Sequence, residues 1–152
     1  MGKKVLIAVD ESEESVHALH WALDSSVVQQ SDEVVLFHAQ PHPRIYAAPA
    51  GPGGFFVAPE LLASIEKHNK QTSEVVVEKA KNICEEKQIN ATVMVGVGDA
   101  REAICETVEK LHADVLVMGS HGYGAVKRVF LGSVSDYCVH NAKCSVLIVK
   151  KK

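Results

Sequence analysis

Five short runs of β-branched and other apolar residues recur along the chain, and a helical pattern follows each of the first four. The runs are residues 3–9, 33–39, 91–97, 114–119 and 145–149. Almost every position in a run is apolar, which is typical of strands covered on both faces in a parallel sheet. Crossover connections between parallel strands are right-handed in nearly all proteins. The order of elements therefore predicts an α/β fold with a doubly wound, five-stranded parallel sheet.

Residues that favour helix N-termini indicate where the helices should begin. Ser12 precedes the first helix and Asp99 the third, and both residue types cap helix N-termini. The second helix is expected over about 59–87, and the fourth from Gly132-Ser133 to about residue 141. Spacings of three and four residues predict buried faces on the first three helices. The residues on these faces are Val16, Leu19, His20, Leu23, Leu61, Leu62, Ile65, Val75, Val76, Ala80, Ile83, Ala103, Ile104, Val108 and Leu111.

The length of the chain, 152 residues, is sufficient for one buried core. No internal repeat or linker divides it, so we expect a single domain over residues 1–152. All five prolines lie between Pro41 and Pro59, in the one long connection without a helical or strand pattern. We interpret this connection as an insertion of variable length, with a mobile lid as the alternative.

Charge and hydropathy exclude several classes of protein. The net charge is -3 and no basic stripe is present, which argues against a nucleic-acid-binding protein. The longest uncharged run, 45–59, is interrupted by proline and glycine, and the apolar core at the N-terminus is too short for a secretory signal. We therefore expect no membrane span and a cytoplasmic location, with a nuclear location as the alternative. The four cysteines lack the spacing of a zinc site and are expected to be buried, reduced thiols.

A glycine-rich stretch, residues 118–140, follows the fourth predicted strand. It leaves that strand at Gly119, passes through Gly122 and enters a helix at Gly132-Ser133. Ligands of open α/β sheets bind beyond the carboxyl ends of the strands, where the strand order reverses. Glycines let backbone N–H groups approach an anion, and a helix N-terminus attracts one. The stretch therefore predicts a phosphate site, with simple turn formation as the alternative.

Other phosphate and catalytic motifs are absent from the sequence. The chain has no GxxxxGK[ST] and no GxSxG, and "GVGDAR" (96–101) lacks the third glycine of a dinucleotide fingerprint. We interpret residues 96–101 as a strand-to-helix turn. His17 and His20 share a helix face, but no further ligands accompany them, so no metal site is predicted.

The spacing of the glycines resembles a known ATP-binding pattern. Gly119 and Gly122, followed after nine residues by Gly132-Ser133, match the pattern G-x2-G-x9-G-[ST] of the universal stress protein family. The segments "VLIAVDES", "LFHA", "GDARE" and "DVLVMGSHG" are similar to other blocks of that family, in their usual order. The resemblance covers essentially the whole chain, and the long connection after the second strand is similar to that of plant-like single-domain members.

The resemblance implies a fold and a ligand. The fold is adenine-nucleotide alpha-hydrolase-like, a Rossmann-like sheet of order 3-2-1-4-5 with its crevice between strands one and four. The ligand is ATP, or AMP or ADP, with Mg2+ or Mn2+ held through the phosphates. By the same resemblance, the cofactor-binding residues are Ala8, Val9, Asp10, Ala39, Met118, Gly119, His121, Gly122, Lys127, Gly132, Ser133, Val134 and Ser135.

Several of these positions carry alternatives. Asp10 would border the adenine, but an acid after a strand can also begin a helix. Lys127 would screen a polyphosphate, but a solvated loop explains a lysine as well. Family members more often have valine where this chain has Ala39, which implies a looser adenine wall. Residues 95–96 are a further candidate for the rim of the pocket.

The fifth predicted strand gives a physical reason for dimerisation. If residues 145–149 form an edge of the sheet, their apolar side chains and unpaired backbone groups need cover. The resemblance implies a homodimer through this strand, and pairing with a two-fold copy would remove the edge.

The chemistry of the predicted site favours a regulator over an enzyme. Hydrolysis of ATP needs a group that activates water beside the γ-phosphate, and no acid follows the first glycines until Asp136. We therefore expect an ATP-binding homodimer that senses or regulates the stress response, and we assign no catalytic residue. Two alternatives stay open: a slow ATPase acting through His121 and Ser133, and a chaperone-like or scaffolding dimer that binds protein clients without nucleotide.

Overall fold

The computed structural model describes residues 2–42, 48–49, 55–56, 58–121 and 131–151. Its main sheet contains five parallel strands in the order β5-β2-β1-β6-β7. Counted along the chain, this is the order 3-2-1-4-5, which confirms the predicted α/β fold. The strands are β1 (Lys4–Ala8), β2 (Glu33–Gln40), β5 (Ala91–Val97), β6 (Val115–Gly119) and β7 (Ser145–Val149).

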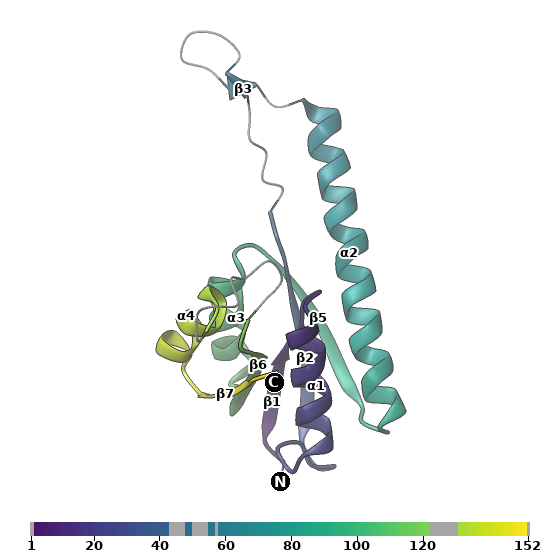
Figure 1. Ribbon diagram of the computed structural model, residues 1–152, viewed down its shortest axis with the longest axis vertical. Helices are drawn as coiled ribbons and strands as arrows, with labels where there is room; N and C mark the ends of the chain where they lie inside the picture. Colours follow the sequence, from purple (N-terminus) through teal and green to yellow (C-terminus); the bar gives the residue numbers. More distant parts are fainter. Residues whose placement is uncertain (1, 43–47, 50–54, 57, 122–130, 152) are drawn as a thin grey trace.

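Helices cover both faces of this sheet (Figure 1). The helices α1 (Glu13–Asp24) and α2 (Pro59–Glu86) pack against one face, and α3 (Ala100–Leu111) and α4 (Ser133–Asn141) against the other. The central strand β1 shows the consequence, because Val5, Leu6 and Ile7 are all 0% exposed although their side chains alternate between the faces. The continuous apolar runs in the sequence therefore reflect strands that are covered on both faces, as predicted.

Capping residues begin two of the helices at the predicted positions. The Ser12 hydroxyl accepts a hydrogen bond from the Ser15 N–H at 3.1 Å, and the Asp99 carboxylate accepts one from the Arg101 N–H at 2.9 Å. Each satisfies a donor that the first turn of a helix leaves unpaired. The turn at residues 96–101 leads from β5 to α3, as predicted, and Gly98 in it has a φ of 139°. The turns after β1 and β5 therefore place the starts of α1 and α3 at the carboxyl ends of these strands.

The long connection after β2 differs from the expected irregular segment. It contains two short strands, β3 (Ala48–Pro49) and β4 (Phe55–Phe56), which pair antiparallel at a distance from the main sheet (Figure 1). The first half of α2 also extends beyond the sheet, because a helix of 28 residues is longer than strands of at most 8 residues. Buried residues of α2 begin only at Ser73.

Two residues on the predicted buried face of α2 are exposed. Leu61 is 50% exposed because it lies on the part of α2 that passes beyond the sheet, and Val75 is 66% exposed beside α1. The prediction was wrong at both positions. None of the helices in the described residues combines the length and the apolar character that a membrane span requires.

Candidate functional site

A pocket of about 70 Å3 lies at the carboxyl ends of β1, β2 and β6. Connections from β1 and β6 leave to opposite sides of the sheet here, which is where open α/β sheets bind ligands. Strand ends contribute Ala8, Val9, Asp10, Phe37, His38, Ala39, Met118, Gly119 and His121. The helix starts contribute Ser12, Ser15, Ala100, Ile104, Val134 and Ser135.

Most of the predicted site residues line this pocket. They are Ala8, Val9, Asp10, Ala39, Met118, Gly119, His121, Val134 and Ser135. Ser133 lines an adjoining groove, and Gly132 is the buried N-cap residue of α4. Gly122 and Lys127 lie outside the described residues.

Sequence reasoning missed the pocket residues of α1 and α3 and two residues near the end of β2. Ser15 lies in the first turn of α1, Ala100 and Ile104 lie in α3, and Phe37 and His38 precede Ala39. One rule could have found part of this set: first turns of helices that follow parallel strands face the carboxyl edge of the sheet.

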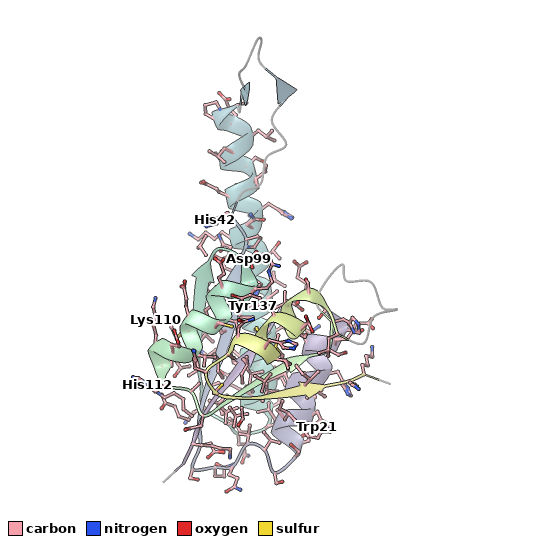
Figure 2. The ribbon with its side chains drawn as sticks, turned by 90° about the vertical axis from the view of Figure 1, so that its left-hand side faces the viewer. Trp21, His42, Asp99, Lys110, His112 and Tyr137 are labelled. Atoms are coloured by element: carbon pink, nitrogen blue, oxygen red, sulfur yellow. The ribbon has the colours of Figure 1, made fainter. Side chains whose placement is uncertain are left out.

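The adjoining groove has a volume of about 430 Å3 and shares Ala39, Ala100 and Val134 with the pocket. Together they fall within the ~300–1,000 Å3 typical of small-molecule sites. Figure 2 shows His42 and Asp99, two residues of the groove, near the middle of the long axis of the molecule, with Tyr137 of α4 just below them. The Arg101 guanidinium also lines the groove, but it is bound to Asp99 at 3.0 Å and lies 6.0 Å from the Tyr137 ring centroid. Its hydrogen bonds lower the pKa of the Asp99 carboxyl.

The N-terminus of α4 opens into both hollows. The Gly132 N–H is already paired, since it donates to the Ser120 carbonyl at 2.7 Å. The N–H groups of Ser133, Val134 and Ser135 occupy the first turn, where a helix provides no acceptors. They carry the positive end of the helix dipole and are suited to an anion.

The hydroxyl of Ser135 has a structural role. It is buried and donates to the Gly119 carbonyl at 2.7 Å, which joins α4 to the end of β6. Its proton is therefore committed within the protein, and the Ser135 N–H is the group that a ligand could use.

Gly119 is required by packing. A Cβ at this position would lie 2.9 Å from the backbone carbon and oxygen of Glu14 in α1. The absence of a side chain lets α1 approach β6 closely, so this glycine shapes the pocket wall whether or not it contacts a ligand.

Asp10 has one of the two roles that the sequence left open, the one at the start of a helix. Its Oδ1 accepts from the N–H and the hydroxyl of Ser12 at 2.8 and 2.5 Å, and its N–H donates to Ser15 Oγ at 2.9 Å. These bonds fix the start of α1, and Asp10 nevertheless lines the pocket. A ligand contact by Asp10 stays a prediction.

Two histidines line the pocket. His38 is buried, with Nδ1 2.9 Å from the Val9 carbonyl, and its Nε2 has no hydrogen-bond partner among the described residues. His121 Nδ1 lies 3.0 Å from Ser120 Oγ. Within the described part of the chain, no cluster of three or more His, Cys, Asp or Glu side chains is arranged to hold a metal ion. His17 and His20 on α1 are half-buried.

The four cysteines are free thiols, as predicted, but only Cys84 and Cys138 are buried, whereas Cys105 and Cys144, also expected to be buried, are half-buried. The sulfur atoms of Cys105 and Cys138 are 3.9 Å apart between α3 and α4. Burial raises the pKa of Cys138 to about 12 and that of Cys84 to about 11, from an ordinary value of 9.0. The reactive thiolate is therefore scarce at neutral pH.

These raised pKa values predict that the free energy of unfolding falls at alkaline pH. Above pH 9.0 the unfolded chain loses thiol protons that the folded protein keeps up to about pH 11 for Cys84 and 12 for Cys138. The unfolded state then binds fewer protons, so stability decreases by up to about 1.4 kcal/mol per pH unit and thiol. Urea unfolding between pH 8 and pH 11 measures the slope. A Cys84→Ala/Cys138→Ala variant should show a shallower one, and equal slopes would contradict the prediction.

Comparison with known proteins supports the family resemblance seen in the sequence, over almost the whole chain. A sequence model described as "Universal stress protein family" matches residues 1–150. The Universal stress protein PHOS34 of Arabidopsis thaliana is 36% identical over 161 residues, which covers 97% of this chain and 62% of that protein. The chain thus spans less than two thirds of the length of this relative.

Solved structures share the fold. An Arabidopsis thaliana universal stress protein family protein with AMP bound superposes with a TM-score of 0.68 at 23% identity, covering 99% of this chain and 92% of the other. The universal stress protein from Archaeoglobus fulgidus in complex with dAMP has a TM-score of 0.64 at 16% identity, covering 99% and 98%.

Proposed function

The chain belongs to the universal stress protein family, and from this premise we propose that it is an adenine-nucleotide-binding homodimer that regulates the stress response. The observation that carries the proposal is the N-terminus of α4, whose first N–H groups open into an apolar crevice at the switch point of the sheet. Related structures contain AMP and dAMP, which supports the same class of ligand here.

The crevice has the chemistry that an adenine nucleotide needs. Small side chains at Ala8, Ala39 and Ala100 leave room for a flat ring, and Ile104 and Met118 add apolar surface. Phosphates would lie at the N–H groups of Ser133, Val134 and Ser135. Mg2+ or Mn2+, which the family resemblance implies, would be held through the phosphates of ATP.

Binding is proposed here in preference to turnover. Among the described residues, Asp10 is the one acid that lines the pocket, and its Oδ1 already accepts two hydrogen bonds from Ser12. A nucleotide-dependent change of partner is therefore the proposed output, and hydrolysis through His121 and Ser133 is the alternative.

Dimerisation is proposed through β7. This strand pairs with β6 alone among the described strands, and Val146, Leu147 and Ile148 are only half-buried. Pairing with the same strand of a second copy would give hydrogen-bond partners to the unpaired backbone groups at this edge. Sedimentation equilibrium tests the proposal, because a mass of 16.4 kDa at every concentration would contradict a dimer.

Titration of the purified protein with ATP, AMP and GTP, each with and without Mg2+, tests the nucleotide site. We expect one adenine nucleotide per chain and at least about tenfold weaker binding of GTP, a difference of about 1.4 kcal/mol. Mass spectrometry of the material released on denaturation identifies any nucleotide that copurifies. If no adenine nucleotide binds, the crevice serves only the fold and the scaffolding dimer becomes the better account.

A further inference from the structure

A second hollow surface lies between α1 and α2, on the face of the sheet that these two helices cover. Figure 1 shows these helices side by side on one face of the sheet. Two hollows between them, of about 210 and 510 Å3, adjoin each other, because Val16, Val75, Lys79 and Ile83 line both. We name the combined hollow the α1–α2 groove.

The α1–α2 groove has an apolar floor. Leu19, Val76, Ala80 and Ile83 are buried beneath it, and Val75 stands in it with 66% of its surface exposed. The residues that α2 contributes recur at each turn from Val75 to Glu86. The twelve residues from Val75 to Glu86 span about 18 Å, a little over three helical turns, so the groove is long enough for a short helix to lie along it.

The rim of the groove is acidic. Glu11, Glu78 and Glu86 are exposed along it, and among the described residues Lys79 is the one lysine that lines it. No ion pair recorded among the described residues involves these three glutamates, whereas Asp32 is paired with Lys3 at 2.7 Å. An apolar trough with an excess of negative charge is complementary to a basic amphipathic surface.

We propose that the α1–α2 groove docks a basic amphipathic helix of a partner protein. The apolar face of such a helix would cover Val75 and the floor, and its lysine or arginine residues would meet the glutamates of the rim. Helices commonly recognise partners by laying an apolar face into a groove of this kind. Docking of such a helix would bury the Val75 side chain, which the described residues of the protein leave exposed.

The groove shares a wall with the nucleotide pocket. Val9, Asp10 and Ser15 line both hollows, and the Asp10 N–H to Ser15 Oγ bond of 2.9 Å crosses this wall. If the pocket binds nucleotide as proposed above, a ligand that shifts the start of α1 changes the groove as well. Coupling of the two sites would be reciprocal, because each ligand alters the affinity for the other by the same factor. This coupling rests on the proposed function, but the docking itself does not.

A fluorescent amphipathic peptide of leucine and lysine, about 15 residues long so that it can form a helix, tests the docking. It is titrated with the full chain in the absence of nucleotide and followed by fluorescence anisotropy. We expect saturable binding that Val75→Lys and Glu86→Lys each weaken by about tenfold or more. Leu61→Lys and Glu85→Lys are matched controls, since both residues are exposed on α2 outside the groove, and should change the affinity by less than about twofold. Amide shifts of Val16, Val75 and Lys79 in NMR spectra should locate the peptide.

Several results would overturn the proposal. These are no saturable binding, equal binding of a leucine–glutamate peptide or of a scrambled basic peptide, and equal loss in the control variants. Self-association of the protein that Val75→Lys abolishes would assign the groove to a second copy instead. The nucleotide titration is independent, so a chain that binds the peptide but no nucleotide would keep this inference and lose the proposed function.

Discussion

Replacement of Gly119 by valine is expected to lower the free energy of unfolding by about 3 kcal/mol, the upper part of the range for overpacked positions. The first atom of the new side chain would lie 2.9 Å from the backbone carbon and oxygen of Glu14. Backbone of a helix cannot turn away as a side chain does, so α1 as a whole must move from β6. Urea unfolding followed by circular dichroism measures the loss.

Gly96→Val is the matched control for Gly119→Val. A Cβ at Gly96 would also meet an atom at 2.9 Å, but that atom is Cζ of the Phe37 ring, which belongs to a side chain that borders the pocket and not to the backbone of a helix. We expect Gly96→Val to cost clearly less. If Gly119→Val has the same free energy of unfolding as the unchanged protein, then packing of α1 against β6 does not require a glycine here. Contact with a ligand would then be the better explanation for this glycine.

The fold could be predicted from local sequence because its main determinants are local. The run Val5, Leu6, Ile7 indicated burial on both faces, and all three residues are fully buried. Ser12 and Asp99 indicated helix starts through side chains that reach only two or three residues along the chain. Elements whose signals lie within a few residues of one another were therefore assigned correctly.

Features that depend on distant contacts were not predictable in the same way. Val75 was included in the buried face, but it precedes the buried Val76 by one position, about 100° around the helix, and is therefore turned away from that face. Gly119 was assigned to a ligand because of its neighbours in sequence, whereas its contact with Glu14 is visible only once α1 is placed. Ile104 was missed as a pocket residue for the same reason, whereas Ser15 could have been found, because it lies in the first turn of a helix that follows a parallel strand.

Gly132→Val is expected to weaken the binding of adenine nucleotide by about 100-fold or more, which corresponds to about 2.7 kcal/mol. Gly132 is the N-cap residue of α4, and its φ of -70° and ψ of 168° are open to valine. Its N–H can keep the 2.7 Å bond to the Ser120 carbonyl. Because Gly132 is buried and valine is a poor N-cap residue, we expect the variant to fold but to lose about 1 kcal/mol or more of stability. The branched side chain would instead stand beside the N–H groups of Ser133 and Val134 and keep a phosphate away from them.

Ala142→Val provides the control at the other end of the same helix. Ala142 is the C-cap residue of α4, with a similar φ of -68° and ψ of 141°, and it lies outside the pocket and the adjoining groove. Calorimetric titration with ATP should show normal affinity in Ala142→Val and almost none in Gly132→Val, while thermal melts in the absence of nucleotide show both variants folded. Normal affinity in Gly132→Val would place the phosphates away from α4. In that event we expect the N–H groups of the first turn to bind a different anion, because the dipole of a helix that opens into a crevice attracts negative charge.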